Sequence, residues 1–568
     1  MAEQRHQGFQ KLRENCRRTA RVLVWTTVIN LLILVGLALI CIMFLPINRP
    51  AGFILDITEY LVPRAFSVQR QKFLRGPLVL GYADRHSVQP GEIFRVLLST
   101  RDEGLSLTGH LEIFRVGHGR QGNREYVSSS PPLKVGYTES LGAVSATGCN
   151  WPVLAAISPE PSWRSGYYSI DFVASDNSRI SEVAYIVVRN PRKDGDIVVL
   201  LSTNTYQAYN QWGGFSLYSG MLGGIDKATM VSFDRPTISQ FNTWEFYYVV
   251  WLEAQGYAVD YITNFDLKQD AGWAENYPLF IVLGHNEYWS KEEFDYVEKR
   301  IFGQGKNVLF LGANLAYWQV RFLDINQAPG GEFLGRQIVC HKLRRDPLVD
   351  RSDEKTSRSL ITDRFRSASR RPESMLMGVM YELDFRPDLP WLTPWQDQRI
   401  PLPGKPFGSQ LHPYFQGGYK PYFPEYFIVE NSLPFFEGTG LKKGESVGGL
   451  VGYEYDNRNP MSSIQERPVF NGEKEKYDLA EGWKSGVSLN EQIPPADIKL
   501  VCRGSATDAY GRTGLAEAVY FETKSGAKVF SAGTISWPWG LGKPGFTNEK
   551  FKKLNLNLIN HMLGPGRK

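Results

Sequence analysis

The chain has 568 residues, which is enough for a large core spread over about two or three domains. Its 64 Lys and Arg residues nearly balance 59 Asp and Glu residues, so the formal net charge is a mild +5. With this charge and no nucleic-acid-binding motif, we expect no DNA or RNA partner. Five cysteines without a CxxC pair argue against a disulfide framework and against a thiolate metal site.

The first predicted element is a membrane-spanning helix at residues 22–45, VLVWTTVINLLILVGLALICIMFL. It has no charged residue and is long enough to cross roughly 30 Å of hydrocarbon. Six Lys and Arg residues precede it and few follow, which places the N-terminus in the cytoplasm. A cleaved signal peptide is the alternative, but the run is too long and no small-residue cleavage site follows it. We therefore predict a single-pass membrane protein with a cytoplasmic basic tail (1–21), a juxtamembrane stalk (46–72) and an extracytoplasmic C-terminal body.

The first part of this body, residues 73–192, has the pattern of a β domain. Short apolar runs such as GEIFRVLLST, GHLEIFRVG and GYYSIDFVAS alternate with turn residues. β-Branched and aromatic residues at this spacing predict an immunoglobulin-like, antiparallel β-sandwich.

The rest of the chain, residues 193–568, has a different pattern. The runs IVVLLS, YPLFIVLG and NVLFLGA are almost wholly apolar, as in strands covered on both faces, and helical segments lie between them. This alternation predicts a doubly wound, parallel α/β sheet, so the fold class is α/β with an added β domain. Helices are expected near 239–255, from Ser290, where Glu293 completes a capping box, and at 548–562.

An Arg-rich segment at residues 341–372 interrupts this pattern. We interpret it as a solvated loop, with a membrane-surface or partner-binding patch as the alternative.

Polar side chains follow four of the predicted strands. In an open α/β sheet, ligands bind beyond the carboxyl ends of the strands, so these side chains are expected to meet in one crevice. His285 and Glu287 are two residues apart in an extended segment and therefore point to the same side. No Ser-His-Asp order, GxSxG, Walker loop or HExxH is present, which argues against a serine or cysteine nucleophile. The candidate side chains are Tyr206, Tyr209, His285, Glu287, Asn314, Thr534 and Ser536.

Four separated motifs carry a family resemblance: STNTYQAYNQWGG, WLEAQGYAVDYIT, LGHNEYWS and SGAKVFSAGTISWPWGL. From roughly residue 163 to 560 the chain resembles the C-terminal region of the large (beta) subunit of N,N-dimethylformamidase. The resemblance implies a β-sandwich followed by a class I glutamine-amidotransferase-like α/β domain. It also implies an amide hydrolase with a mononuclear, non-haem ferric iron held by two tyrosines and one glutamate. The residues that match these roles are Glu287, Tyr209 and Tyr168 as metal ligands, with Tyr167 as an alternative to Tyr168, His285 as a partner of the ligands, and Asn314 and Glu454 in the pocket.

Such a site has a consistent chemistry. Phenolate and carboxylate oxygens stabilise a trivalent cation, which can polarise an amide carbonyl and acidify a bound water. Glu454 is then expected to move the proton of the water, while His285 orients Glu287 or stabilises the oxyanion. The expected partners are the membrane and a small amide or envelope-derived substrate, and a homo-oligomer is left open. The alternative functions are a glycan-binding or glycan-processing surface protein, suggested by 14 Trp residues, and a non-catalytic scaffold.

Overall fold

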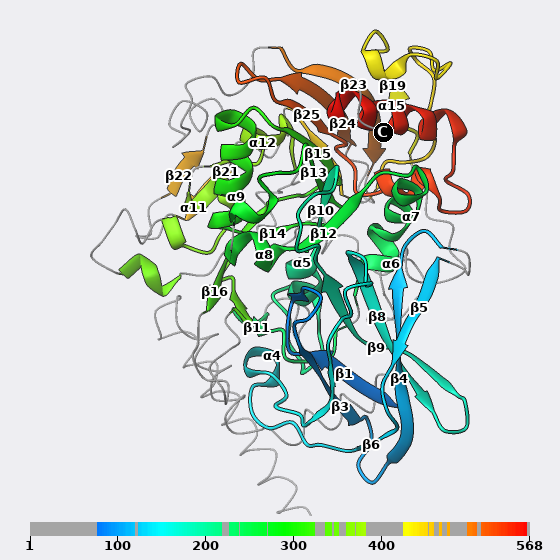
Figure 1. The fold of residues 1–568 in the computed structure, drawn as a ribbon. Helices are drawn as coiled ribbons and strands as arrows, with labels where there is room; N and C mark the ends of the chain where they lie inside the picture. Colours follow the sequence, from blue (N-terminus) through cyan, green and yellow to red (C-terminus); the bar gives the residue numbers. More distant parts are fainter. Residues whose placement is uncertain are drawn as a thin grey trace, which may run out of the picture. The chain divides into compact units, whose positions relative to one another are not determined.

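A computed structural model describes residues 77–564 of the chain (Figure 1). All the described residues belong to one compact unit, Arg64–Lys568. Within it, Cys149, Cys340 and Cys502 are buried free thiols. The description leaves out residues 120–122, 219–226, 238, 270, 324–334, 343–345, 351–358, 370, 382–423, 453, 459–464, 469–473, 478–496 and 508–512.

The predicted membrane anchor is not supported. In the part of the chain that the structure describes, no helix has the length and apolar character needed to span a bilayer. The longest helix described, α15 (Glu549–Leu563), has 15 residues, too few for the roughly 20 that a spanning helix needs. Residues 22–45 lie outside the described residues, as do the predicted tail and stalk. The described residues therefore do not support the prediction of a single-pass anchor with an extracytoplasmic body, which was based on hydropathy and flanking charge alone.

Two sheets pack around one core in the first part of the described chain. Leu98, Leu111, Phe172 and Ile186 are fully buried members of this core. Strand β2 runs parallel to β9, so the strand pairing here is not wholly antiparallel. The larger sheet has the order β2 (Ser87–Val88), β9 (Arg179–Val188), β8 (Gly166–Ala174), β4 (Ser106–Val116) and β5 (Arg124–Ser129), and β6 (Leu133–Gly136) also pairs with β4. The smaller sheet has the order β1 (Val79–Ala83), β3 (Phe94–Thr100) and β7 (Val153–Ile157). A short helix, α4 (Val144–Thr147), lies between β6 and β7 in the chain.

An eight-stranded mixed sheet forms the centre of the second part. Its first five strands are parallel, but β24, β23 and β19 pair antiparallel. The predicted parallel, doubly wound sheet is therefore wrong, because the sheet is mixed. The physical reason is the short turn between β24 and β25, since so short a connection can join only antiparallel neighbours. The strand order is β12 (Val259–Thr263), β10 (Ile197–Leu201), β13 (Leu279–Leu283), β15 (Asn307–Leu311), β25 (Lys528–Ser531), β24 (Thr513–Glu522), β23 (Lys499–Thr507) and β19 (Phe427–Ile428).

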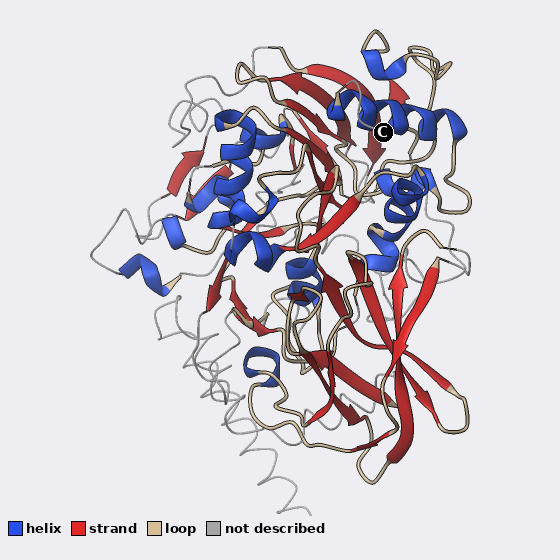
Figure 2. Ribbon diagram, in the orientation of Figure 1, coloured by secondary structure: helices blue, strands red, loops and turns tan. Residues whose placement is uncertain are grey.

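Both faces of the parallel strands are covered (Figure 2). Along β10, Ile197 and Val199 belong to one hydrophobic cluster, while Val198 and Leu200 belong to the other. This explains why the strand is wholly apolar rather than alternating. The cluster of Ile197 includes residues of α7 (Phe246–Ala254), the 3-10 turn Trp537–Leu541 and α15; that of Val198 includes residues of α8 (Asn264–Gln269), α9 (Lys291–Glu298), the π-helical turn Lys299–Gly303 and α12 (Ser374–Met377).

Shorter elements complete the described chain. The helices are α5 (Thr203–Tyr209), α6 (Phe241–Trp244) and α11 (Phe365–Ala368), with 3-10 turns at Ala271–Ala274, Pro347–Asp350 and Pro434–Phe436. A four-stranded sheet has the order β11 (Met230–Ser232), β17 (Gln337–Val339), β16 (Trp318–Leu323) and β14 (Tyr288–Ser290), and two pairs are formed by β18 (Met380–Tyr381) with β20 (Asp456–Asn457) and by β21 (Gln465–Pro468) with β22 (Lys474–Tyr477).

The sandwich strands contact the α/β part directly. Arg115 on β4 forms a buried ion pair of 2.6 Å with Glu253 on α7, and Tyr167 on β8 stacks on Phe241 of α6 at 4.1 Å. The domain boundary predicted at residue 192 falls between β9 and β10. These contacts hold β4 and β8 against α7 and α6.

Candidate functional site

The ends of four parallel strands bring a polar group together, which we call the His285 centre: Tyr209, His285, Glu287, Asn314 and Glu454. Tyr209 is the last residue of α5, the helix that follows β10. His285 and Glu287 follow β13, and Asn314 follows β15. Glu454 comes from a distant segment, but its carbonyl accepts a hydrogen bond of 3.2 Å from Ile535, which follows β25.

Gly284 turns the chain out of β13 and into this centre. Its φ of +75° lies in the left-handed region that favours glycine. A Cβ at this position would lie 2.9 Å from the carboxyl carbon of Glu245. Glu245 is fully buried, accepts hydrogen bonds from the Tyr206 hydroxyl at 2.7 Å and from the Ser202 N–H at 3.4 Å, and has its pKa raised to about 7 by burial.

His285 lies between two carboxylates. Its Nε2 is 3.0 Å from Glu454 Oε2 and 3.4 Å from Glu287 Oε2. Glu287 Oε2 also accepts a hydrogen bond of 2.6 Å from the Tyr209 hydroxyl, and Asn314 Nδ2 donates to Glu454 Oε1 at 3.0 Å. The close approach of His285 to Glu454 is an ion pair rather than an aligned hydrogen bond, since neither of the two facing atoms has a hydrogen-bond partner among the described residues.

Burial controls the charges of this centre. His285, Glu287, Asn314 and Glu454 are each at most 3% exposed, whereas Tyr209 is partly exposed. Burial lowers the pKa of His285, but Glu454 and Glu287 outweigh it and raise that pKa to about 10. Burial raises the pKa of Glu454, while His285 more than offsets burial at Glu287 and lowers the pKa of that carboxyl. At neutral pH His285 is therefore an imidazolium beside an ionised Glu287.

An aromatic cluster with a buried lysine lies against the centre. Tyr209 stacks on Tyr218 at 4.9 Å and meets Tyr288 edge-on at 6.0 Å between ring centroids. Lys342 Nζ donates to the Tyr288 hydroxyl at 2.7 Å and lies 4.7 Å from the ring centroid of Trp318. Burial lowers the pKa of Lys342, and the charge of Glu287 opposes that effect.

Sequence reasoning missed this lysine. Lys342 is 3% exposed, and Asp346, Arg366 and Arg371 of the same segment are also buried. The prediction of a solvated loop at 341–372 is therefore wrong for the described residues of that segment. The charges there are paired inside the protein: Arg366 binds Glu373 at 2.6 Å. No local pattern signals this, because the partners are distant in sequence or come after the segment.

A family model described as N,N-dimethylformamidase beta subunit-like, C-terminal matches residues 110–550. The chain belongs to this family. The match confirms the resemblance seen in the four sequence motifs, and it spans all five residues of the His285 centre. A search of curated proteins found no match. A search of solved structures matched a chain from a study of T cell specificity and activation by the bacterial superantigen toxic shock syndrome toxin-1. The two chains are 12% identical, and the match covers 20% of this chain and 98% of the other, with a TM-score of 0.13. We draw no structural inference from a match with so low a TM-score.

The dimethylformamidase resemblance assigned a second tyrosine ligand that the structure does not bring to the centre. The Tyr168 hydroxyl donates to the Arg164 carbonyl at 2.6 Å, and its ring stacks on Trp163 in the sandwich core. Tyr167, the alternative, donates to Glu182 at 2.5 Å. Among the described residues, no contact joins either ring to Glu287.

The oxygen donors at the His285 centre match only part of the iron site that the family resemblance implies. Within the described ranges, no group of three or more His, Cys, Asp or Glu residues is arranged to hold a metal ion. Tyr209 and Glu287, however, place two hard oxygen donors in contact, and the facing atoms of His285 and Glu454 are buried without a hydrogen-bond partner among the described residues. Burial and Glu287 raise the pKa of Tyr209, so the phenol is protonated here and would ionise beside a trivalent cation.

Proposed function

We propose that this protein hydrolyses the C–N bond of a small linear amide at the His285 centre. The observation that carries the proposal is the placement of His285 Nε2 within 3.0 Å and 3.4 Å of two buried carboxylates. Membership of the dimethylformamidase-like family supports the same reaction class.

We further propose that Tyr209 and Glu287 hold a ferric ion. When bound, such an ion supplies Lewis-acid chemistry, which polarises an amide carbonyl. Tyr168 is not included, because its hydroxyl is bonded to the Arg164 carbonyl. Lys342 offsets the desolvation of Glu287 and so helps to keep that carboxyl ionised.

Glu454 is the group that moves protons. Asn314 holds its Oε1 at 3.0 Å, which leaves Oε2 facing His285. Because burial raises its pKa, this carboxyl is suited to accept a proton from the attacking water as the water oxygen bonds to the carbonyl carbon. It returns that proton to the amide nitrogen as the C–N bond breaks, which gives a carboxylic acid and an amine.

His285 contributes a fixed positive charge. Its raised pKa keeps Nε2 protonated at neutral pH. A buried donor of this kind stabilises negative charge that develops on the carbonyl oxygen, without reorganisation of solvent.

The glycan-binding alternative depends on exposed aromatic platforms. No tryptophan is among the exposed large hydrophobic residues of the described chain, and Trp244, Trp289, Trp537 and Trp539 are among its largest fully buried side chains. The described residues therefore offer no observation that favours this function or a scaffold.

The test is amine release from a panel of small linear amides by iron-loaded protein. Wild type should release amine, while Glu287→Gln and Glu454→Gln should lose most activity. Glu445→Gln, at a surface carboxylate paired with Lys550, is the matched control and should retain it. Release of no amine by the wild type, or full activity of Glu454→Gln, would contradict the proposal.

A further inference from the structure

The turn that follows β15, which we call the Asn314 turn (residues 312–318), has an unusual backbone. Asn314 and Ala316 have φ values of +55° and +50°. This left-handed region is uncommon for residues other than glycine. At an alanine the conformation is strained, and such strain persists only where surrounding contacts hold it. Contacts from other segments must therefore hold the Asn314 turn.

The Asn314 turn contacts both carboxylate-bearing segments of the His285 centre. The side-chain Nδ2 of Asn314 donates to Glu454 Oε1 at 3.0 Å. The Glu287 carbonyl accepts hydrogen bonds from the N–H groups of Tyr317 and Trp318, at 2.9 Å and 3.0 Å. The position of this one turn therefore determines where the Glu454 carboxyl and the Glu287 backbone lie relative to each other.

Asp456 holds the start of the Asn314 turn. Its Oδ1 accepts the N–H of Asn314 at 2.9 Å, and the residue is 1% exposed. Asn314 is thus bonded through its main chain to Asp456 and through its side chain to Glu454, two residues away on the same segment. That segment is itself fixed, because the Asp456 N–H donates to the Gly533 carbonyl at 3.0 Å and the Glu454 carbonyl accepts from Ile535 at 3.2 Å.

The protonation state of Asp456 suits a hydrogen-bond acceptor rather than a counter-ion. Burial raises its pKa to about 8, and the charges of Glu373 and Glu454 act in the same direction. The carboxyl is therefore mostly protonated at neutral pH, and its Oδ1 acts as a carbonyl oxygen. An asparagine at this position would keep that oxygen and would add no charge.

We infer that Asp456 is a positioning residue of the His285 centre, which acts by holding the N–H of Asn314 and with it the left-handed turn. Because Glu454 is the group proposed to move protons, release of this turn should slow the chemical step more than it weakens substrate binding. The kinetic part of the inference rests on the proposed function, whereas the hold on the turn can be measured without activity.

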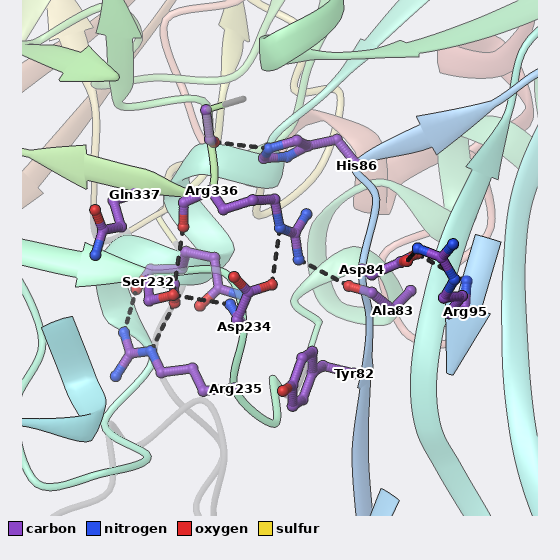
Figure 3. Close-up of polar contacts among 12 residues, drawn as sticks. Tyr82, Ala83, Asp84, His86, Arg95, Ser232, Asp234, Arg235, Arg336 and Gln337 are labelled. Carbon is purple, nitrogen blue, oxygen red and sulfur yellow. Dashed lines mark hydrogen bonds and ion pairs between the residues drawn. The ribbon is translucent and has the colours of Figure 1, made fainter. Parts of the chain in front are cut away.

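Asp84 in the sandwich offers a matched control. It is buried, its pKa is also raised by burial, and its Oδ1 accepts the backbone N–H of Arg95 at 2.7 Å. Figure 3 shows Asp84 in contact with Arg95, next to Ala83. None of these residues belongs to the His285 centre, so Asp84→Ala removes a bond of the same kind elsewhere.

The test measures hydrogen exchange and amine release for the full chain of wild type, Asp456→Ala, Asp456→Asn and Asp84→Ala. Mass spectrometry follows exchange in the peptide that contains residues 312–318. Asp456→Ala should speed this exchange by about tenfold. It should also lower kcat by about tenfold to hundredfold, with KM changed by less than about threefold. Asp456→Asn and Asp84→Ala should stay within about threefold of wild type in both measurements.

Four results would overturn the inference: unchanged exchange in Asp456→Ala, losses in Asp456→Asn as large as those in Asp456→Ala, equal losses in Asp84→Ala, or a rise in KM without a fall in kcat. If Asp456→Ala does not fold, a loss of exchange protection or of kcat in Asp456→Asn overturns the inference by itself. If the wild type releases no amine, the proposed hydrolysis fails, and exchange in the two Asp456 variants alone decides the inference.

Discussion

The backbone turn at Gly284 directly determines the position of the segment that carries His285 and Glu287. Replacing it with alanine keeps the side chain small but adds a Cβ at a φ of +75°. The added carbon would meet Glu245 at 2.9 Å from its carboxyl carbon and 3.1 Å from Oε1. Because Glu245 is fully buried, it cannot simply swing into solvent, and the turn that carries His285 must shift instead.

The expected cost has two parts. A left-handed backbone costs an alanine about 1–2 kcal/mol relative to glycine. Overpacking a close-packed interior adds about 1–3 kcal/mol. Gly284→Ala should therefore destabilise the fold by about 2–5 kcal/mol.

The control is Gly256→Ala, at the exposed end of α7. Gly256 has a φ of +86° and nothing within 4 Å of an added Cβ, so this variant carries the backbone cost alone. Denaturant unfolding of both variants separates the two costs, and amine release reports on the centre. We expect Gly284→Ala to lose more stability than Gly256→Ala and to lose activity as well. Equal losses of stability, with activity retained in both, would refute the role given to this turn.

Three further predictions concern charge. In metal-free protein, the pKa of His285 is raised from 6.5 to about 10. The stabilising contribution of the imidazolium is therefore complete below pH 6.5 and is lost as the pH rises through about 10. The thermal midpoint should fall over this range more steeply in wild type than in His285→Gln, and parallel curves would contradict this role of His285. Lys342→Met removes a cation that lowers the pKa of Glu287, so the acidic limb of the pH–rate profile should move to higher pH, and an unchanged limb would exclude this role. Glu253→Gln leaves the buried Arg115 without its carboxylate and should cost about 3 kcal/mol in denaturant unfolding; a cost near zero would show that the pair does not hold the sandwich to α7.

Sequence patterns correctly predicted the strands and helices that are determined by residues close together in the chain. The wholly apolar runs appear as β10, β13 and β15. The capping box of Ser290 and Glu293 is present at the start of α9, and the predicted C-terminal helix is α15, capped by Asn548. The helix predicted at 239–255 is divided at Glu245 into α6 and α7, where that carboxylate turns inward to Tyr206 and Ser202.

The features that depend on distant contacts were not predictable. The turn at 523–527 marks β24 and β25 as a hairpin, but no local pattern shows that β23 and β19 extend the same sheet in antiparallel order. Lys342 is buried because Tyr288, far earlier in the chain, accepts its hydrogen bond. Adjacent residues of a strand face opposite sides, so Tyr168 enters the sandwich core while Tyr167 packs toward α6. A motif match could not reveal that neither ring contacts Glu287.

The most direct test of ferric iron binding at the His285 centre is the visible absorption spectrum of wild type, Tyr209→Phe and Tyr168→Phe after ferric iron is added. Charge transfer from a phenolate to ferric iron gives a visible band, which reports the ligand itself. The account predicts this band in wild type and in Tyr168→Phe, and its loss in Tyr209→Phe. A band that survives in Tyr209→Phe and disappears in Tyr168→Phe would contradict the His285 centre as described.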